Sequence, residues 1–305
     1  MIQRRLGNTE VHVSQFGLGC NRIGEPQLSE KEWISLLHRS AEEGVTYYDT
    51  AAMYTKGRSE EILGKAFGKR NDIIIATKVT PLRDSTHSPY PSSHIIDETE
   101  KSLRRLKRDQ IDILQTHGAE LEDGPFDDRA AETLMKLREQ GKIRFRGASL
   151  NNVKAGIHAC ERRSVDMMQI TYNILSHDMV LSLLDMARKH GVGIVARKPL
   201  QRGVLTGKYA SVDDVPSEAR ALIERKNLTF QIKATANLKG QLNIPSHKLI
   251  EMALHFPLTH PAVCSVIFGI RNEAQFFENI SAARSLSLSQ KEVDQLKRFR
   301  QSLCF

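Results

Sequence analysis

A carboxylate and a phenol, Asp49 and Tyr54, lie close together in this sequence, directly after residues that favour a β-strand. Those residues, Thr46 to Tyr48, are β-branched or aromatic and fit a pleated, half-buried surface. A turn over residues 55–58 follows, and a helix begins at Ser59. The acid and the phenol are therefore expected in one strand-to-helix loop, a favoured place for chemistry in α/β folds. Taken alone, the pair is more often a turn residue and a packing aromatic, so the rest of the chain must decide.

The surrounding chain alternates short apolar runs, which predict strands, with amphipathic segments, which predict helices. The run 73–78 is nearly all apolar, as in strands covered on both faces, while Ser29 and Glu32 form a capping box at the start of the first helix. The expected strands cover 16–20, 46–49, 73–78, 111–117, 143–149, 167–172, 192–197 and 263–268. The expected helices lie near 29–43, 59–68, 95–106, 128–140, 153–162, 180–190 and 249–256, after 272 and after 289.

This series of strand–helix units predicts an α/β fold with a parallel sheet. Eight units within 305 residues favour a closed (β/α)8 TIM barrel over an open doubly wound sheet. Residues 2–13 predict an N-terminal β-hairpin around Gly7-Asn8, an extra helix ends the chain, and a partly helical connection is expected over 199–245. A dinucleotide fold of the Rossmann type is excluded because Gly17-Leu18-Gly19 lacks the third glycine. Residues 1–305 are expected to form a single domain.

In a parallel barrel all strands end at the same face, where active sites are built. Polar or ionisable residues end one expected strand after another and should meet Asp49 and Tyr54 there. They are Lys78, His117, Ser149, Asn173, Arg197 and, just beyond the last strand, Arg271. Each alone has an ordinary structural explanation, but their convergence on one rim predicts a functional site.

The group around the phenol predicts a specific chemistry. Tyr54 is a poor acid at neutral pH, since a free phenol has a pKa of about 10, and an adjacent Lys78 ammonium is expected to lower that pKa. Asp49 can pair with Lys78 and keep it charged, and His117 can orient a substrate oxygen beside Tyr54. This set suits proton delivery to a carbonyl that receives a hydride, and the hydride itself requires a nicotinamide or a flavin.

With these residues in place, the chain resembles the aldo-keto reductase superfamily over nearly its whole length. The matching motifs are Asp49-Thr50-Ala51-x-x-Tyr54, Gly57-x-Ser59-Glu60, Thr77-Lys78, Leu103-x-x-Leu106-x-x-Asp109-x-Ile111-Asp112 with His117 behind it, Gln169-x-x-Tyr172-Asn173, Pro199-Leu200-x-x-Gly203-x-Leu205-Thr206-Gly207-Lys208-Tyr209 and Gly269-x-Arg271-x-x-x-Gln275-x-x-Glu278-Asn279. The resemblance implies that Tyr54 is the general acid, that Asp49 and Lys78 tune it, and that His117 orients the carbonyl.

The resemblance also implies a cofactor, NADP (as NADPH), extended across the barrel mouth. Ser149 and Gln169 would hold its carboxamide, the 199–208 loop and Lys208 would cover its pyrophosphate, and Arg271 would favour a 2′-phosphate. The full set of cofactor-binding residues implied is Cys20, Asn21, Asp49, Ser149, Leu150, Gln169, Arg197, Pro199, Leu200, Gln201, Gly203, Lys208, Gly269, Ile270, Arg271, Gln275, Glu278 and Asn279. From periodicity alone, Gln275, Glu278 and Asn279 are equally the polar face of a helix.

Two positions depart from the family pattern. Leu150 follows Ser149 where many relatives have Asn, and Asn151 comes one place later. Arg197 stands where many relatives stack an aromatic ring on the nicotinamide. Its charge disfavours the oxidised, cationic ring, which predicts a preference for reduced cofactor.

Composition narrows the class of protein further. The net charge of +8 allows an anionic ligand, but basic and acidic residues are interspersed, and the run 104–108 is best explained as a solvated helix end, so nucleic acid is not expected. No apolar run is long enough to cross a bilayer, and no secretory signal is evident. The cysteines, Cys20, Cys160, Cys264 and Cys304, have no metal-like or redox spacing. They suit the cytoplasm, and no metal site is expected.

The leading hypothesis is thus an NADPH-dependent reductase acting on a small-molecule carbonyl substrate. A cofactor-binding regulatory subunit, like the potassium-channel β-subunits that share this fold, and an NADP-dependent oxidation of a sugar or polyol are the alternatives. Substrate choice depends on the loops 79–93 and 117–127, which carry no decisive feature, and the oligomeric state is left open.

Overall fold

The computed structural model describes residues 1–82, 90–118, 126–176 and 180–303 of the chain. Eight parallel strands close into a barrel in the order β10-β3-β4-β5-β6-β7-β8-β9. The barrel strands are β3 (Phe16–Gly19), β4 (Tyr47–Asp49), β5 (Ile74–Val79), β6 (Ile111–His117), β7 (Ile143–Leu150), β8 (Met167–Thr171), β9 (Gly193–Arg197) and β10 (Val263–Gly269). The (β/α)8 barrel predicted from the alternation of strands and helices is confirmed.

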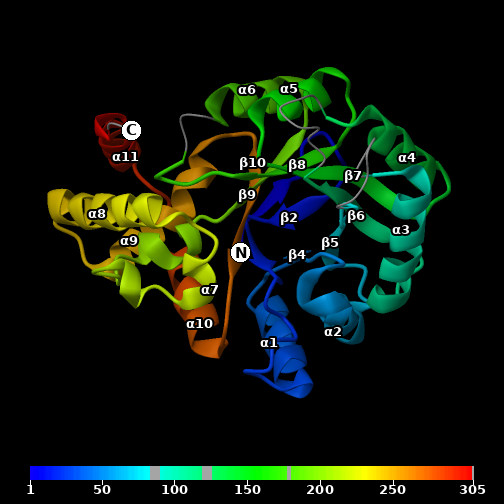
Figure 1. Cartoon of the computed structure of the whole chain (residues 1–305), viewed down its shortest axis with the longest axis horizontal. Helices are drawn as coiled ribbons and strands as arrows, with labels where there is room; N and C mark the ends of the chain where they lie inside the picture. The colour runs from blue at the N-terminus through cyan, green and yellow to red at the C-terminus, as the bar shows by residue number, and fades with distance from the viewer. Residues whose placement is uncertain (83–89, 119–125, 177–179, 304–305) are drawn as a thin grey trace.

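The predicted N-terminal hairpin is confirmed and closes one end of the barrel. Strands β1 (Gln3–Arg5) and β2 (His12–Ser14) pair antiparallel, with Gln3 opposite Ser14. Leu6, Val11 and Val13 of this hairpin are buried in one cluster with side chains that fill the barrel interior. The hairpin lies across the strands at the centre of Figure 1. The opposite end, where the strands terminate, is left for the functional side chains.

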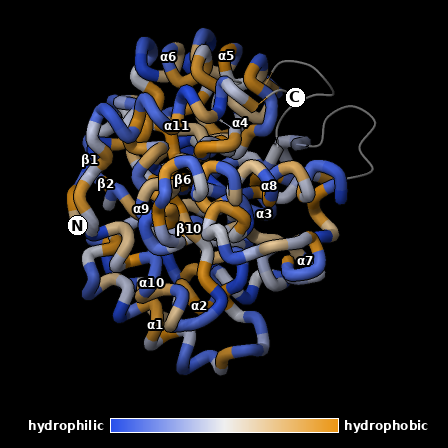
Figure 2. Tube along the Cα trace, turned by 90° about the vertical axis from the view of Figure 1, so that its left-hand side faces the viewer, coloured by the Kyte–Doolittle hydropathy of each residue, from blue (hydrophilic) through white to orange (hydrophobic). Residues whose placement is uncertain are grey.

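Amphipathic helices surround the strands (Figure 1), and hydrophobic and hydrophilic residues alternate along them (Figure 2). The α-helices are α1 (Glu30–Glu42), α2 (Arg58–Phe67), α3 (Ser92–Leu106), α4 (Asp128–Glu139), α5 (Val153–Glu161), α6 (Leu181–His190), α7 (Ser217–Arg220), α8 (Arg225–Leu242), α9 (Ser246–His255), α10 (Glu273–Ala283) and α11 (Gln290–Ser302). Four 3₁₀ segments complete the set of described helical elements: η1 (Tyr54–Gly57), η3 (Gln201–Thr206), η4 (Val212–Asp214) and η5 (Phe256–Thr259).

The local signals that predicted these helices are present in the structure. Ser29 and Glu32 form both hydrogen bonds of the capping box at the start of α1, and Trp33 is buried against the barrel. Ala41 of α1 is only partly buried, while its neighbour Ser40 is fully buried and its hydroxyl bonds to the Leu37 carbonyl and the Tyr48 phenol.

The connection between β9 and α9 is mostly helical, as predicted. It contains η3, η4, α7 and the long helix α8, and a separate apolar cluster including Val204, Leu228 and Ile232 holds it together. In the part of the chain that the structure describes, no helix is long and apolar enough to cross a membrane.

Candidate active site

A lysine and an aspartate form a buried ion pair at the end of the barrel where the strands terminate. Lys78 on β5 places Nζ 2.6 Å from Oδ2 of Asp49 on β4 and donates a second hydrogen bond, of 2.8 Å, to the Thr50 carbonyl. The two side chains are 0% and 3% exposed. Burial is the largest single influence and would lower the pKa of Lys78, but the Asp49 carboxylate and the Tyr54 phenol together outweigh it and raise that pKa, so Lys78 is a cation.

The ring of Tyr54 lies next to the Lys78 end of this pair. It begins η1 directly after β4, and the chain then passes through left-handed backbone at Thr55 (φ 47°) and Lys56 (φ 56°). The Lys78 Nζ lies 5.1 Å from the centre of the Tyr54 ring. Lys78 acts on the phenol pKa in the expected direction, lowering it, but it does not bring the pKa of Tyr54 below its ordinary value. Burial raises the pKa of Tyr54 above its ordinary value, and the nearby Lys78 charge opposes that rise without cancelling it.

His117, the last residue of β6, lies beside the phenol. Its ring centre is 6.0 Å from that of Tyr54, with the two planes 87° apart. Burial, and next the charge of Lys78, lower the pKa of His117 to about 4, so the imidazole is neutral near pH 7. Its Nδ1 has no hydrogen-bond partner among the described residues. A neutral ring in this place can bond to an oxygen without adding charge.

The second oxygen of Asp49 accepts hydrogen bonds from two buried amides. Nε2 of Gln115 lies 3.1 Å from Oδ1, and Nε2 of Gln169 lies 2.6 Å from it. The Ser149 hydroxyl donates to the Gln169 carbonyl oxygen at 3.4 Å. Ser149 and Gln169, expected near the nicotinamide, therefore lie beside the Lys78–Asp49 pair, and here Gln169 contacts Asp49. Gln115 was missed, although it precedes His117 by two positions and must face the same side of β6.

Arg197, at the end of β9, also reaches this rim. Its Nη2 donates to the Leu150 carbonyl and to Oδ1 of Asn151, so the two positions that depart from the family pattern, 150 and 197, contact each other. The guanidinium charge is close enough to lower the pKa values of both Tyr54 and His117. A cation thus faces the reacting end of the site. Asn173, also expected on the rim, instead fixes the next loop by donating to the Lys198 carbonyl and to Gln201.

A cavity of about 310 Å³ lies next to this rim, between the ends of β3 and β10 and the 198–222 segment. Most of the predicted cofactor-binding residues line it: Asn21, Pro199, Leu200, Gly203, Lys208, Gly269, Ile270, Arg271, Gln275, Glu278 and Asn279. The side-chain oxygen of Gln275 accepts from the Arg271 backbone N–H, and Asn279 is buried. Gln275 and Asn279 are therefore not simply the solvated face of α10.

Seven of the predicted cofactor residues do not line the cavity. Five of them belong to the neighbouring rim of strand ends: Asp49, Ser149, Leu150, Gln169 and Arg197. The other two are Cys20 and Gln201. Cys20 is fully buried, its thiol bonds to the Leu18 carbonyl, and burial raises its pKa. Gln201 turns away because its side chain accepts from Asn173.

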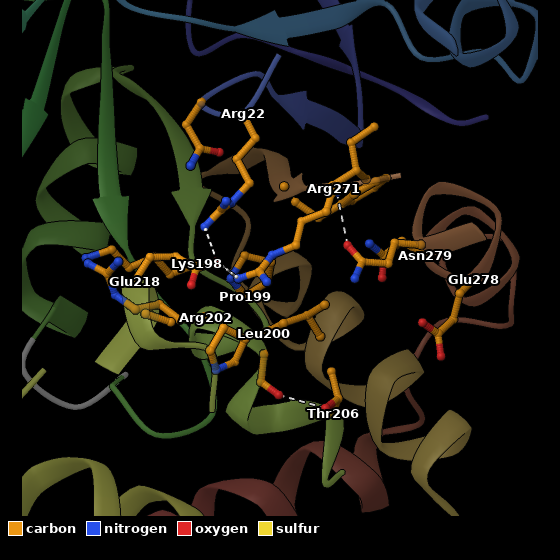
Figure 3. A pocket seen from close by; sticks show the side chains of 18 of the residues that line it. Arg22, Lys198, Pro199, Leu200, Arg202, Thr206, Glu218, Arg271, Glu278 and Asn279 are labelled. Carbon is orange, nitrogen blue, oxygen red and sulfur yellow. Dashed lines mark hydrogen bonds and ion pairs between the residues drawn. The ribbon is translucent and has the colours of Figure 1, made fainter. Parts of the chain in front are cut away.

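Sequence reasoning missed several of the cavity's polar residues, among them Arg22, Lys198, Arg202 and Glu218. Arg22 follows the end of β3. It would have been identified if the search for polar residues at strand ends had included this strand. No sequence signal indicated Glu218, which lies on the short helix α7. Figure 3 shows Arg22, Lys198 and Arg202 at one end of the cavity and Glu278 and Asn279 at the other.

The cavity suits the phosphates of a dinucleotide. Five cationic side chains line it against two carboxylates: Arg22, Lys198, Arg202, Lys208 and Arg271 against Glu218 and Glu278. Burial, and then the charges of Arg197 and Arg202, lower the pKa of Lys198 to about 8. The backbone of this loop is left-handed at Gln201, Arg202 and Gly203. Turns of this kind can direct successive backbone N–H groups to one side, where they can bind an anion. A bound anion would offset the electrostatic repulsion between these cations. The described residues hold no group of three side chains suited to a metal ion.

Comparisons with known proteins agree with this geometry. The family model described as the aldo/keto reductase family matches residues 15–301. The uncharacterized oxidoreductase YqkF of Bacillus subtilis (strain 168) is 33% identical, covering 97% of this chain and 96% of its own. A probable voltage-gated potassium channel subunit beta of Arabidopsis thaliana is 29% identical, covering 94% and 93%.

A solved aldo-keto reductase structure has the same fold as this chain. The holo form of aldo-keto reductase AKR11C1 from Bacillus halodurans superposes with a TM-score of 0.81 at 28% identity, covering 100% of this chain and 98% of that one. The chain therefore belongs to the aldo/keto reductase family, whose members are oxidoreductases that use nicotinamide cofactors.

Proposed function

We propose that this protein reduces an aldehyde or ketone to the alcohol, with NADPH as the cofactor and Tyr54 as the general acid. The observation that carries the proposal is the buried Lys78–Asp49 ion pair beneath a half-buried tyrosine that has a neutral histidine beside it. The group is built to place one proton donor and one hydrogen-bond donor at the same oxygen.

Each side chain has a distinct role in this proposal. Tyr54, with its raised pKa, is protonated at neutral pH and gives its proton to the carbonyl oxygen. The Lys78 cation stabilises the phenolate that is left, and Asp49 holds Lys78 charged and in place. His117 bonds to the same oxygen and aligns it with the phenol.

The proposed cofactor lies with its phosphates in the cationic cavity. The bound cofactor supplies the hydride that the protein's own side chains lack. Arg22, Lys208 and Arg271 would hold its phosphates, with Arg271 bonding to the 2′-phosphate as a guanidinium can in bidentate fashion. The charge of Arg197 near the reacting end favours the reduced, uncharged nicotinamide, which supports reduction over oxidation of a sugar or polyol.

The protein is further proposed to work in the cytoplasm on a small-molecule substrate. Cys20, Cys160 and Cys264 are buried free thiols, as expected in a reducing compartment, and Cys304 lies outside the described residues. The substrate loops are described only in part, because residues 83–89 and 119–125 lie outside the described ranges.

The test compares the natural protein with Tyr54→Phe for oxidation of NADPH, and of NADH, with a panel of aldehydes and ketones. Turnover is expected with NADPH in the natural protein and a large loss in the variant, while the dissociation constant for NADPH is unchanged. Full activity of Tyr54→Phe would show that Tyr54 is not the general acid.

The alternative is a cofactor-binding regulatory subunit, which the similarity to a potassium channel β-subunit supports. Tight NADPH binding without turnover of any carbonyl, together with a partner that co-purifies, would favour that role. Absence of binding of both NADPH and NADH would overturn the cofactor site itself.

A further inference from the structure

Both oxygens of the Asp49 carboxylate accept hydrogen bonds. Oδ2 accepts from Lys78, and Oδ1 accepts from the amides of Gln115 and Gln169. Both glutamines are almost completely buried. A hydrogen bond to an ionised group is worth more than one between neutral groups, about 1.5–3 kcal/mol. The two amides therefore contribute to fixing the carboxylate, not only to filling the barrel.

The two amides differ in their other contacts. Gln169 also accepts from Ser149 and lies towards the part of the rim where the nicotinamide is proposed to bind. The amide nitrogen of Gln115 bonds only to Asp49 among the described residues, and its carbonyl oxygen has no partner there. A buried amide with unused hydrogen-bonding capacity is costly, so its one bond is the feature that explains its presence.

The neighbouring strand leaves room for this side chain. Gln115 pairs with Lys78 on one side and with Gly147 on the other. A Cβ at Gly147 would lie 2.7 Å from Cγ of Gln115 and 2.8 Å from Sδ of Met167, which is closer than real contacts allow. Glycine at position 147 thus lets Gln115 occupy the barrel interior beside Asp49.

We propose that Gln115 is a positioning residue of the catalytic group. It holds Oδ1 of Asp49 so that Oδ2 stays directed at Lys78, and it does so without contacting the cofactor cavity. If Gln169 turns to the cofactor, as its neighbour Ser149 and the family resemblance suggest, Gln115 keeps the carboxylate in place. This inference rests on the proposed role of Asp49 and Lys78 beneath Tyr54.

The hydrogen bond itself is tested in the cofactor-free protein by side-chain amide signals in ¹H–¹⁵N NMR spectra. The signals of Gln115 and Gln169 are identified by their loss in Gln115→Met and Gln169→Met. In Asp49→Asn both signals are expected to shift, while that of the exposed Asn227, which bonds to Glu224, stays in place. An unshifted Gln115 signal would overturn the inference, whatever the activity of the protein.

The consequence for catalysis is tested with Gln115→Met, which keeps the volume and removes the donor. We expect kcat to fall about tenfold, as loss of one hydrogen bond to a charged group implies, with an unchanged dissociation constant for NADPH. Thr116→Val is the matched control, because Thr116 is the next residue on β6, is fully buried and has a hydroxyl without a partner among the described residues. It should retain the natural kcat.

A double-variant cycle separates positioning from a general loss of packing. In the Asp49→Asn background Gln115→Met should lower kcat by less than about twofold, since the group that it positions is already altered. Equal losses in both backgrounds, or a natural kcat in Gln115→Met, would overturn the inference. Retained activity of Tyr54→Phe would instead overturn the proposed function and leave the NMR result standing.

Discussion

The Nζ of Lys78 and Oδ2 of Asp49 lie 2.6 Å apart, and water is excluded from both side chains. Their surroundings differ: besides Lys78, Asp49 has two buried amide donors, whereas Lys78, besides Asp49, has the Thr50 carbonyl and the half-buried Tyr54 phenol. Removing one member of a buried pair is costly because the other charge is left uncompensated. The unequal surroundings determine which removal is worse.

We expect Asp49→Asn to destabilise the fold by about 3 kcal/mol and Lys78→Met by less, since the Asp49 carboxylate retains its amide donors. The double variant Lys78→Met/Asp49→Asn should be more stable than Asp49→Asn alone, while all three should have a strongly reduced but measurable kcat. Urea unfolding and kcat measured on the same preparations check this. Equal stability of the two single variants would show that the amides do not support Asp49.

His117 predicts a pH dependence of stability. Burial lowers its pKa from 6.5 to about 4 in the folded protein, so between these values the unfolded chain binds a proton that the folded protein does not. Stability from this residue is complete above pH 6.5 and is lost as the pH falls towards 4. The contribution is at most about 3 kcal/mol, since one pKa unit corresponds to about 1.36 kcal/mol.

In His117→Phe this loss of stability between pH 6.5 and 4 is expected to disappear, giving a flatter curve of unfolding free energy against pH. The exposed His247→Asn serves as the control and should follow the natural protein. Parallel curves for His117→Phe and the natural protein would contradict the assigned burial of the imidazole.

Much of this site follows from the sequence because strand ends and barrel topology place residues together. The limits of β6, Ile111 to His117, agree with the apolar run that predicted them, and His117 lies beside Tyr54 because both follow inward-facing strand ends. The Lys78–Asp49 pair follows for the same reason, as β4 and β5 are neighbours.

Other features depend on distances that periodicity does not encode. The raised pKa of Tyr54 results from burial under loops whose path a sequence pattern cannot give. Gln115 and Gln169 meet at one oxygen although β6 and β8 are separated by β7, and this depends on the small residue Gly147 between them. Glu218 reaches Arg22 and Arg271 from a helix that has only four residues and no clear period.

Arg271 is expected to set the choice between the two nicotinamide cofactors. Its guanidinium lines the cavity and suits a phosphate better than a hydroxyl. We expect Arg271→Ala to weaken NADPH binding by about 10- to 100-fold, equivalent to about 1.4–3 kcal/mol, and to leave NADH binding nearly unchanged. Fluorescence titration with both cofactors measures this. A similar loss for NADH would place Arg271 against a part that the two cofactors share.

Glu218 lines the cavity and pairs with both Arg22 and Arg271. Oε1 lies 3.1 Å from Arg271 Nη2 and 3.3 Å from Arg22 Nη2, so one carboxylate neutralises two guanidinium groups that a phosphate would otherwise meet. Its side chain is 47% exposed, so solvent screens both ion pairs strongly. Competition with a bound phosphate is therefore real but modest.

We expect Glu218→Gln to tighten NADPH binding by about two- to fivefold, because a charge that repels the phosphate is removed, while the amide keeps the side chain's size. The gain should shrink as salt is added and should be smaller for NADH, which lacks the 2′-phosphate. Glu224→Gln is a matched control on the same segment, since its carboxylate bonds to Asn227 and not to either arginine. Weaker binding of both cofactors to Glu218→Gln would instead mean that the carboxylate serves mainly to hold α7 over the occupied cavity, with Arg22 and Arg271 as its anchors.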